Sequence, residues 1–357
     1  MKVLVAMSGG VDSSVAAALA LDAGHDVTGV HLKLAHRDPV SAAPGQGCCT
    51  LDDAQDARRV AQVLDIPFYV WDLSDRFQRE VQDPFAADYA AGRTPNPCVR
   101  CNERVKYAGL LDRARALGFD ALATGHHARI RTDGHTRLLR ATDRAKDQSY
   151  VLYSATADQL AHTLLPVGEL TKADVRAEAE LRGLRVATKP DSYEVCFVPE
   201  GTRAYLADRL PVRQGPIVDV DGRVHGTHEG VWSVTVGQRR GLALAGHERR
   251  FVVDVDASTD TVVVGPREAL ASRWVRLDRV SWIGGRPPQG DVRVQVRAHG
   301  RTVLGHVDGD RLVFDQPHEG VACGQAAVVY SADDRECLGG GTVIAAERPV
   351  RVAVPTS

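Results

Sequence analysis

The sequence predicts an α/β protein with three parts: a parallel, doubly wound sheet domain, a small β-rich domain and a C-terminal β-barrel. Up to about residue 198, apolar runs of strand length alternate with segments of helical spacing, which is the pattern of a parallel sheet with helices on both faces. Beyond that point helical spacing fades, glycine becomes frequent and short β-like runs dominate, as in small barrels. We therefore expect domains at residues 1–198, 199–272 and 273–357.

The first domain opens with a strand–turn–helix unit. The apolar run of residues 2–7 leads into a pair of glycines, and residues 13–23 keep helical spacing. Further strands are expected at residues 27–32, 68–71 and 121–125, and further helices at residues 50–64, 104–117 and 171–183. The carboxyl ends of the strands, where ligands bind in open α/β sheets, carry Ser8, Leu32 and Gly125.

The C-terminal half supplies short strands and a basic surface. Residues 231–236 and 251–255 are expected to be strands, and from residue 292 to 297 valines alternate with Arg293, Gln295 and Arg297. One face of this last strand should be buried and the other basic. Residues 273–311 contain eight Arg, no Lys and four Asp. Such an excess is typical of a surface that contacts nucleic-acid phosphates, although a solvated barrel face would show it too.

The composition is that of an ordinary globular protein. The chain has 357 residues, a net charge of −2, 44% apolar and 25% charged residues, which is ordinary for a globular protein. It has no run of 18 uncharged apolar residues and no signal-peptide pattern, so we expect a cytoplasmic protein without a membrane partner. Its seven cysteines should then be reduced, and a cluster of them is more often catalytic or metal-binding than structural.

The stretch Ser8-Gly9-Gly10-Val11-Asp12-Ser13-Ser14 is the most informative of the chain. Two adjacent glycines allow a tight turn, and amide groups, hydroxyls and the positive end of the next helix then suit a pyrophosphate group. No Gly-Lys-Ser/Thr follows, so the loop is not a Walker A motif. Its spacing resembles the PP-loop of ATP pyrophosphatases, which cleave ATP between the α and β phosphates and adenylate a substrate oxygen. An ordinary glycine turn is the alternative.

Three cysteines are candidates for chemistry. Cys101 follows a proline-rich loop, is flanked by arginines and lies where the helix at 104–117 should begin. Cations and a helix N-terminus can lower a thiol pKa to roughly 3.5–7.5 and favour a nucleophilic thiolate. Cys98 forms a Cys-x-x-Cys pair with Cys101, and with Cys196 the pair could hold an iron–sulfur cluster; alternatively, Cys196 could carry sulfur. The cysteines interpreted as non-catalytic are Cys48, Cys49, Cys323 and Cys337.

Together these features resemble the tRNA-specific 2-thiouridylase family, which belongs to the PP-loop ATP pyrophosphatases. That family combines the PP-loop with a reactive cysteine on a proline-rich loop and a second cysteine near the domain end. The matching segments are residues 6–14, 92–97, 101–102, 123–126, 146–150, 191–192 with 196–197, and 236–242. The resemblance implies that the barrel at the C-terminus contacts tRNA.

The resemblance also implies which residues bind. ATP would be bound by Ala6, Met7, Ser8, Gly9, Gly10, Val11, Asp12, Ser13, Leu32 and Gly125, with Asp12 near the phosphates or their Mg²⁺. The target base would lie beside Asn96, Pro97 and Cys98. The tRNA would contact Lys146, Asp147, Gln148 and Arg297. No resident metal ion is implied.

The reaction that the resemblance implies begins with the wobble uridine of a tRNA, whose 2-oxygen attacks the α-phosphate of ATP and leaves an adenylate and pyrophosphate. Cys196 carries a persulfide that a sulfur-relay protein supplies. Either this persulfide attacks carbon 2 directly, or Cys101 attacks Cys196 and releases hydrosulfide. AMP leaves, and a Cys101–Cys196 disulfide remains to be reduced. We expect the enzyme to be a monomer.

One position departs from the family pattern. Cys98 stands three residues before the nucleophile, where many members have aspartate, and this leaves the proton-transfer assignment open. It also keeps open an iron–sulfur-dependent tRNA thiolase that uses Cys98, Cys101 and Cys196. A PP-loop amide-forming ligase would leave Cys101 and Cys196 without a role, and a non-catalytic RNA-binding protein would leave the PP-loop without one.

Overall fold

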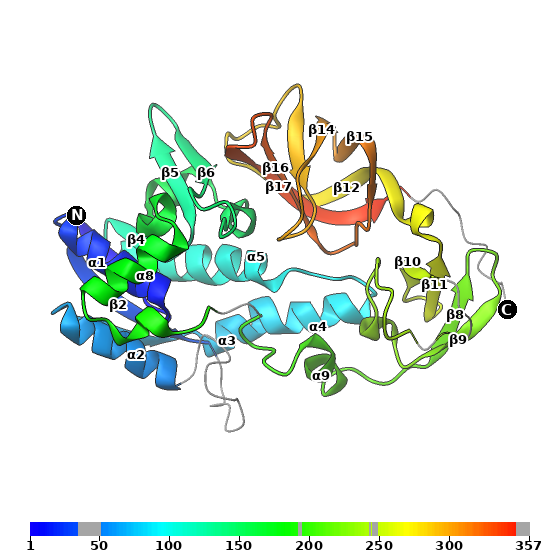
Figure 1. Ribbon diagram of the computed structural model, residues 1–357, viewed down its shortest axis with the longest axis horizontal. Helices are drawn as coiled ribbons and strands as arrows, with labels where there is room; N and C mark the ends of the chain where they lie inside the picture. The colour runs from blue at the N-terminus through cyan, green and yellow to red at the C-terminus, as the bar shows by residue number, and fades with distance from the viewer. Residues whose placement is uncertain (35–50, 192–194, 243, 245–248, 348–357) are drawn as a thin grey trace.

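The computed structural model describes residues 1–34, 51–191, 195–242, 244 and 249–347. Within these ranges the strands form three sheets, of five, four and eight strands. In Figure 1 the five-stranded sheet lies at the left, the four-stranded sheet at the right, and the barrel between them in the upper middle. Cys48, Cys49, the expected helix cap Thr50 and the motif residue Ser192 lie outside the described residues. Of the helices in the described ranges, none is both long and apolar enough to cross a membrane.

The first sheet is parallel, as the strand–helix alternation predicts. Its strand order is β3-β2-β1-β4-β7, and every pairing within it is parallel. The strands are β1 (Lys2–Ala6), β2 (Asp26–Lys33), β3 (Phe68–Asp72), β4 (Ala121–Thr124) and β7 (Thr163–Leu164). Ala6 pairs with Val30 of β2 and with Thr124 of β4, so the carboxyl ends of the three central strands meet at one edge.

Helices cover both faces of this sheet, so it is doubly wound. Val3 and Val5 of β1 pack on one side and Leu4 packs on the other. The helices on the Val3 side are α1 (Val11–Asp22), α2 (Leu51–Val63) and α8 (Lys172–Leu181). The Leu4 side is covered by one continuous rod, which consists of α5 (Pro97–Cys101), the π-helical segment η2 (Asn102–Leu111) and α6 (Asp112–Ala116). The capping box that Thr171 and Asp174 predict for α8 is present.

Two stretches of the first domain differ from expectation. The helix expected at 104–117 begins at Pro97 instead, because Asn96 caps it and proline suits the first helical position. The chain before this rod forms α3 (Ser74–Phe77), η1 (Gln78–Gln82) and α4 (Asp83–Ala90), for which the sequence analysis predicted nothing. Phe85 of α4 packs with Trp232 of the second domain, so this arm joins the two domains (Figure 1). Shorter elements are η3 (Ser149–Leu152), α7 (Ala157–Ala161), η4 (Pro166–Glu169), η5 (Arg185–Thr188) and α9 (Thr202–Ala207).

The second sheet has the order β10-β11-β8-β9 and mixes parallel with antiparallel pairs. Its strands are β8 (Gly215–Asp219), β9 (Val224–His228), β10 (Phe251–Asp256) and β11 (Thr261–Gly265). The strand expected at 231–236 is wrong. Val231–Ser233 form the 3₁₀ segment η6, and buried Trp232 donates from Nε1 to the carbonyl of Pro211. A short apolar run does not by itself distinguish a strand from a buried turn.

The third sheet contains the expected C-terminal barrel, in which β12 and β17 pair and close six antiparallel strands. These are β12 (Ala271–Trp282), β13 (Val292–Gln295), β14 (Val303–Asp308), β15 (Arg311–Glu319), β16 (Ala326–Ser331) and β17 (Glu336–Ala346), preceded by η7 (Arg267–Leu270). Val292, Val294 and Val296 are buried, as their alternation predicts. Gln295, expected on the basic outer face, is only 4% exposed, because another part of the chain covers it.

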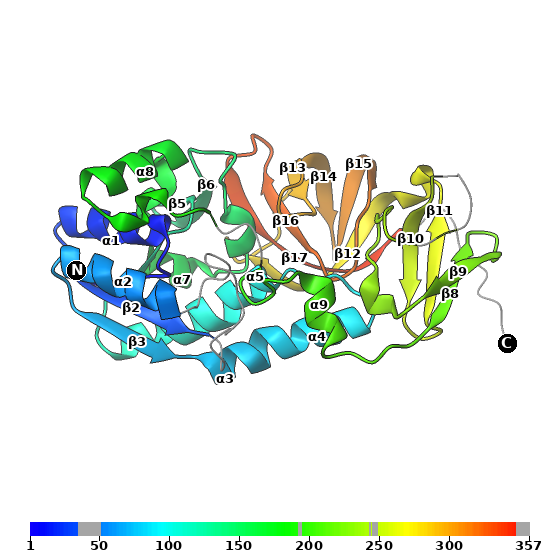
Figure 2. The same ribbon diagram turned by 60° about the horizontal axis from the view of Figure 1, so that its bottom comes forward.

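That part is a hairpin of β5 (Ala128–Thr132) and β6 (Thr136–Arg140), which follows β4 in the first domain. Strand β6 pairs with β17, with Leu139 opposite Glu336 and Leu138 opposite Cys337, and Figure 2 shows the hairpin beside the barrel. The first domain thereby extends the sheet of the barrel to eight strands. The sequence analysis did not predict this hairpin, and the domain bounds at residues 198 and 272 remain predictions.

We expect Leu138→Ala to lower the free energy of unfolding by about 2–5 kcal/mol, because it leaves a cavity in a buried contact. Leu138 is 0% exposed and belongs to the same apolar cluster as Tyr330 and Cys337 of the barrel. Urea unfolding measures the change. Leu304→Ala is the control, since Leu304 is 44% exposed and its truncation should change stability by less than about 0.5 kcal/mol. Equal effects of the two substitutions would contradict the role given to the hairpin.

Candidate active site

The loop between β1 and α1 has the shape that its glycines predict. Gly9 adopts a φ of +82°, and a Cβ there would lie 2.3 Å from the carbonyl oxygen of Asp53. Gly125, just after β4, is as tightly placed, because a Cβ would come within 2.5 Å of the amide nitrogen of Ser13. The loop is therefore held between α2 and the end of β4, and both glycines are required by close approaches of backbone.

This loop directs hydrogen-bond donors at one region. Gly10 is the N-cap of α1 and no side chain caps that helix, so the amides of its first turn are left for another acceptor. The hydroxyls of Ser8 and Ser13 lie 3.1 Å apart. Such donors at the positive end of a helix suit a phosphate group. Four other residues expected to bind ATP lie in or beside β1, α1 and β2: Ala6, Met7, Val11 and Leu32. Both backbone groups of Met7 are engaged within the chain, the amide by Val30 O and the carbonyl by His31 Nδ1.

Asp12, in the first turn of α1, is the acidic group of this site. Its carboxylate accepts from Lys172 Nζ at 2.7 and 2.8 Å and from His127 Nε2 at 3.1 Å. Burial alone would raise the pKa of Asp12, but hydrogen bonds from His127 and Lys172 outweigh it and hold the pKa below its usual value. Asp12 is therefore ionised at neutral pH, and Lys172 adds a cation beside the PP-loop.

The two histidines after β4 have separate roles. Lys106 Nζ lies 3.2 Å from His126 Nε2, and Thr124 Oγ1 lies 2.8 Å from His126 Nδ1. Because an ammonium group only donates, Nε2 accepts and Nδ1 carries the proton. Burial, with Lys106 and His127 adding to it, lowers the pKa of His126 well below its usual value, so this ring is neutral. His127 donates to Asp12 and so orients that carboxylate.

Lys189 links the PP-loop to α2. Its Nζ donates to Gly9 O at 3.0 Å, to Asp53 Oδ1 at 2.7 Å and to Asp56 Oδ2 at 2.9 Å. Burial alone would lower the pKa of Lys189, but the two carboxylates outweigh it and raise the pKa. Sequence reasoning missed Lys189, because a single lysine before a proline carries no motif of its own.

Asp191 joins the phosphate site to the expected RNA-contact segment. Its carboxylate pairs with Lys172 at 2.9 Å, with Lys146 at 2.7 Å and with Arg176 at 2.7 Å. Burial alone would raise the pKa of Asp191, but hydrogen bonds from Lys146 and Lys172 lower it to about 2. Lys172, which sequence reasoning also missed, therefore lies between two carboxylates, Asp12 and Asp191.

The true start of the helical rod changes the surroundings of the cysteines. The side chain of Asn96 accepts from the amide of Cys98 at 3.0 Å and caps the helix. Cys98 is exposed in the first turn, whereas Cys101 lies one turn further along and is half-buried. The expectation that Cys101 occupies the helix N-terminus is therefore wrong. The positive helix end acts more strongly on Cys98, since its effect falls off within the first turn.

The proline-rich loop lies where all three domains meet. Thr94 N donates to Cys323 O of the barrel at 2.8 Å, and Gln325 Nε2 donates to Thr94 O at 2.7 Å. Thr94 Oγ1 donates to Thr235 Oγ1 of the second domain at 3.3 Å. This junction leads directly into the residues expected to contact the target base, which are Asn96, Pro97 and Cys98.

Cys101 and Cys196 are both half-buried and pack against the same apolar cluster of the first domain. The residue after Cys196 is fixed by edge-to-face ring contacts. The centroid of the Phe197 ring lies 5.5 Å from that of Phe77, 5.2 Å from that of Phe85 and 5.1 Å from that of Tyr205. The two cysteines therefore border one core, and the disulfide between them remains a prediction.

Burial raises the pKa of Cys337 to about 12, as expected for a packing residue.

The residues expected to contact RNA have different surroundings. Gln148 is exposed and Lys146 is 29% exposed, whereas the Asp147 side chain is only 4% exposed and pairs with Arg140. Arg297 is exposed, and its guanidinium donates to Gly320 O. Asp147 thus holds its loop in place, whereas contact of the other three with RNA stays a prediction. Tyr150 and Trp232 are only 2% and 6% exposed, so their rings belong to the core and not to a surface on which a base could stack.

The described residues contain no preformed metal site, but they can accommodate a Mg²⁺ that arrives with ATP. Among the described residues, no group of three or more His, Cys, Asp or Glu side chains is arranged to hold a metal ion, and this includes Cys98, Cys101 and Cys196. A Mg²⁺ that accompanies ATP needs only one or two carboxylates besides phosphate oxygens and water. Asp12 supplies one such carboxylate beside the PP-loop, so the residues fit a nucleotide-bound Mg²⁺.

Three family models match consecutive parts of the chain. The tRNA methyl transferase HUP domain matches residues 1–200, the tRNA methyl transferase PRC-barrel domain residues 203–266, and the aminomethyltransferase beta-barrel domain residues 272–343. The tRNA-specific 2-thiouridylase MnmA of Salinispora tropica is 54% identical over 97% of this chain and 99% of its own length. The chain belongs to the tRNA-specific 2-thiouridylase family.

Other members of the 2-thiouridylase family are similar over equally long stretches. MnmA of Thermobifida fusca is 49% identical over 99% of this chain and 98% of its own length. MnmA of Streptomyces coelicolor is 50% identical over 98% of this chain and 96% of its own length. A solved 4-thiouridine synthetase–RNA complex with bound ATP is 18% identical with a TM-score of 0.38, over 56% of this chain and 45% of that chain. A structural similarity this low supports no argument.

Asp191→Asn should remove one component of acid stability. The pKa of Asp191 is lowered from 3.8 to about 2 in the folded chain, so its stabilising effect is complete above about pH 4 and is lost as the pH falls toward about 2. The melting temperature of the wild-type chain should therefore exceed that of the variant by a constant amount above about pH 4, and the excess should shrink below it. Thermal unfolding at a series of pH values measures this. An excess independent of pH would contradict the ion pairs of Asp191.

Proposed function

We propose that this chain is a tRNA 2-thiouridylase, which uses ATP to adenylate the 2-oxygen of the wobble uridine and then replaces that oxygen by sulfur from a cysteine persulfide. AMP and pyrophosphate are the other products. The observation that carries the proposal is one domain that combines an uncapped PP-loop helix, a Lys172–Asp12 ion pair and two half-buried thiols. Membership of the 2-thiouridylase family supports it.

In the adenylation step, the first-turn amides of α1 and the hydroxyls of Ser8 and Ser13 would bind phosphate oxygens of ATP. Lys172 would stabilise the negative charge that grows as the α–β bond breaks, which is the main contribution that fixed charges make to such reactions. Asp12 would hold the Mg²⁺ of the nucleotide, and this ion would supply charge neutralisation to the pyrophosphate. His127 would keep the carboxylate of Asp12 in place.

In the sulfur step, adenylation makes carbon 2 reactive because AMP is a better leaving group than oxide. The terminal sulfur of a Cys196 persulfide would attack carbon 2 as AMP leaves. The Cys101 thiolate would then attack the inner sulfur, break the S–S bond and leave 2-thiouridine and a Cys101–Cys196 disulfide. In the other order, Cys101 attacks first and releases hydrosulfide, which attacks carbon 2. An external thiol would reduce the disulfide, and a sulfur-relay protein would reload Cys196.

The tRNA would bind across the first domain and the barrel, with its target base turned out toward Asn96 and Pro97. Turning a base out costs a few kcal/mol, which contacts to the rest of the RNA must offset. Lys146, Gln148 and Arg297 would supply such contacts. The loop before Asn96 supports this placement, because Thr94 is hydrogen-bonded to both the barrel and the second domain.

An iron–sulfur form of the same reaction is the second candidate, because Cys98 stands exposed at the position of the family aspartate and forms a Cys-x-x-Cys pair with Cys101. It would require Cys196 to move, since the three cysteines are not arranged as a metal site in the described part of the chain. Anaerobic purification followed by iron analysis and visible spectroscopy distinguishes the two forms. Stoichiometric iron with a broad visible absorbance would favour the cluster, and its absence from an active preparation would favour the persulfide.

The decisive assay incubates the protein with ATP, Mg²⁺, a sulfur donor and unmodified tRNA, and measures 2-thiouridine by nucleoside mass spectrometry. We expect the product with the wild-type chain and none with Cys196→Ser, because serine cannot carry a persulfide. Exchange of labelled pyrophosphate into ATP in the presence of tRNA should survive in the variant, since adenylation precedes sulfur transfer. A wild-type chain that adenylates and thiolates no tRNA would contradict the function, and loss of exchange in Cys196→Ser would contradict the role of Cys196.

Lys172→Met should slow tRNA-dependent pyrophosphate release at least about 100-fold, because removal of one charge-stabilising donor costs that much in comparable sites. Pyrophosphate release under single-turnover conditions measures it. Lys33→Met is the matched control: Lys33 pairs with Asp72 at the surface, with a side chain 48% exposed, and its loss should leave the rate within twofold. Similar rates in the two variants would remove Lys172 from the adenylation site.

A further inference from the structure

Arg140, the last residue of β6, is a buried cation at the contact between the first domain and the barrel. Its side chain is only 8% exposed. Nη1 donates to Asp147 Oδ2 at 2.7 Å, and Nη2 donates to Asp334 Oδ1 at 3.0 Å and to Gln295 Oε1 at 3.0 Å. The guanidinium also lies over the ring of Tyr330, 3.5 Å from its centroid. One side chain of the first domain therefore contacts three residues of the barrel.

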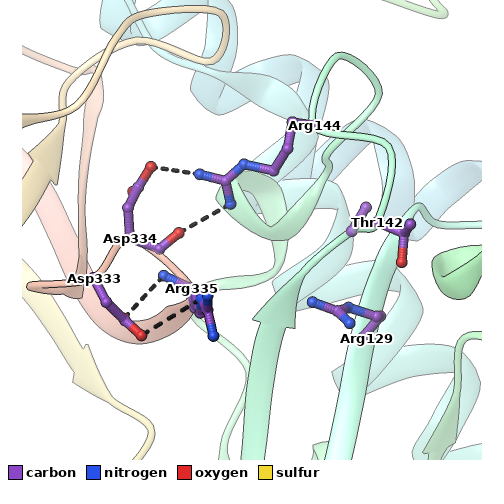
Figure 3. Close-up of a pocket in the computed structure, with 7 residues that line it drawn as sticks. Arg129, Thr142, Arg144, Asp333, Asp334 and Arg335 are labelled. Atoms are coloured by element: carbon purple, nitrogen blue, oxygen red, sulfur yellow. Dashed lines mark hydrogen bonds and ion pairs between the residues drawn. The ribbon is translucent and has the colours of Figure 1, made fainter.

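The barrel partner Asp334 lies in the turn between β16 and β17 and receives a second arginine. Arg144 donates to both the carbonyl and the carboxylate of Asp334, as Figure 3 shows. These residues border a cavity of about 470 Å³ between the hairpin and the turn, lined by Arg129, Ala141, Thr142, Arg144, Asp333, Asp334 and Arg335. Two arginines, Arg140 and Arg144, therefore connect the end of β6 and the loop after it to Asp334 of the barrel.

The other partner, Asp147, organises the loop itself. Its carboxylate accepts from Ala141 N at 2.9 Å and from Ser149 Oγ at 2.8 Å, so it closes the loop on itself. The residues on either side of Asp147 are Lys146 and Gln148, which are expected to contact RNA. Because hydrogen bonds hold Asp147 in place, the backbone of its two neighbours, Lys146 and Gln148, is held as well.

The same loop reaches the phosphate site. Gln148 exchanges two hydrogen bonds with the backbone of His127, at 2.7 and 2.9 Å, and His127 donates to Asp12. Lys146 pairs with Asp191. The side-chain hydrogen bonds of Arg140 run to Asp147 and the barrel instead. A change at Arg140 therefore releases the barrel from the loop, while Lys146 and Gln148 keep the loop attached to the phosphate site.

We propose that Arg140 is a positioning residue for RNA: by sharing its guanidinium between Asp147 and Asp334, it fixes the loop that carries Lys146 and Gln148 against the barrel, so that the two domains present one continuous surface to tRNA. The inference rests on the proposed function. Arginine suits this role because its two terminal nitrogens donate in fixed directions, Nη1 to Asp147 and Nη2 to Asp334, while the flat guanidinium lies over the ring of Tyr330.

The test compares Arg140→Gln with the wild-type full-length chain. We expect the KM for unmodified tRNA in the thiolation assay to rise at least tenfold, kcat at saturating tRNA to stay within threefold, and the Kd for ATP, from equilibrium dialysis, to stay within twofold. Arg140→Lys should recover part of the loss, because an ammonium group can still neutralise one of the two carboxylates. A merely structural role would lower tRNA and ATP binding together.

Asp334→Asn provides an independent variant if Arg140→Gln fails to fold. It weakens only the barrel side and leaves Asp147 paired with Arg140, so the KM for tRNA should rise several-fold with unchanged ATP binding. Arg131→Gln is the matched control: it removes one positive charge from the same hairpin, where Arg131 pairs with Glu169 at the surface, and its KM should stay within twofold of wild type.

Two results would overturn the inference. A tRNA KM within twofold of wild type in both folded variants would show that the contact does not position the loop, and a parallel loss of ATP and tRNA binding would show general destabilisation. Either result leaves the proposed function intact. A wild-type chain that neither binds nor thiolates tRNA would instead overturn the proposed function, and this inference with it.

Discussion

The site depends on the sharing of Lys172 between Asp12 and Asp191. Lys172 is the first residue of α8, where the helix dipole disfavours a cation. The two carboxylates, at 2.7 and 2.9 Å, offset that cost, and Asp143 accepts the Lys172 amide. The capping box of Thr171 and Asp174 starts α8 at this point, so a local helix signal places a charge beside a loop some 160 residues earlier in the chain.

The parts of the fold that local signals specify could be predicted from the sequence. The glycine pair after β1, the strand–helix alternation and the Thr171 capping box each act within a few residues, and each led to the right element. The start of the helical rod was missed, although Asn96 and Pro97 are ordinary start signals, because the two prolines of this stretch also indicate a stiff loop. The β5–β6 hairpin could not be placed, because its partner strand lies almost two hundred residues away and leaves no local signal.

The residues of the candidate site also differ in whether a local sequence signal identifies them. The tight turn of the PP-loop was predicted, because adjacent glycines before a helix have a direct geometric reason to form it; phosphate binding by its residues stays a prediction. Lys172 and Lys189 were missed, because each is a single lysine that acquires its role only when the sheet brings α8 and the segment after it to the loop. Gln295 was assigned to an open basic face and is buried instead, since alternation along one strand does not reveal what will cover it.

The pairing of β6 with β17 has a consequence for how the chain folds. On a ribosome, the parallel sheet and the PP-loop can assemble once about the first half of the protein has emerged, because their contacts lie within it. The outer edge of β6 must wait until β17 is synthesised, and an unpaired strand edge is prone to association with other chains. The nascent protein therefore passes through a stage in which its first domain is formed while the edge of β6 is still unpaired and exposed. A truncated chain that lacks the barrel would remain at that stage and would be expected to self-associate.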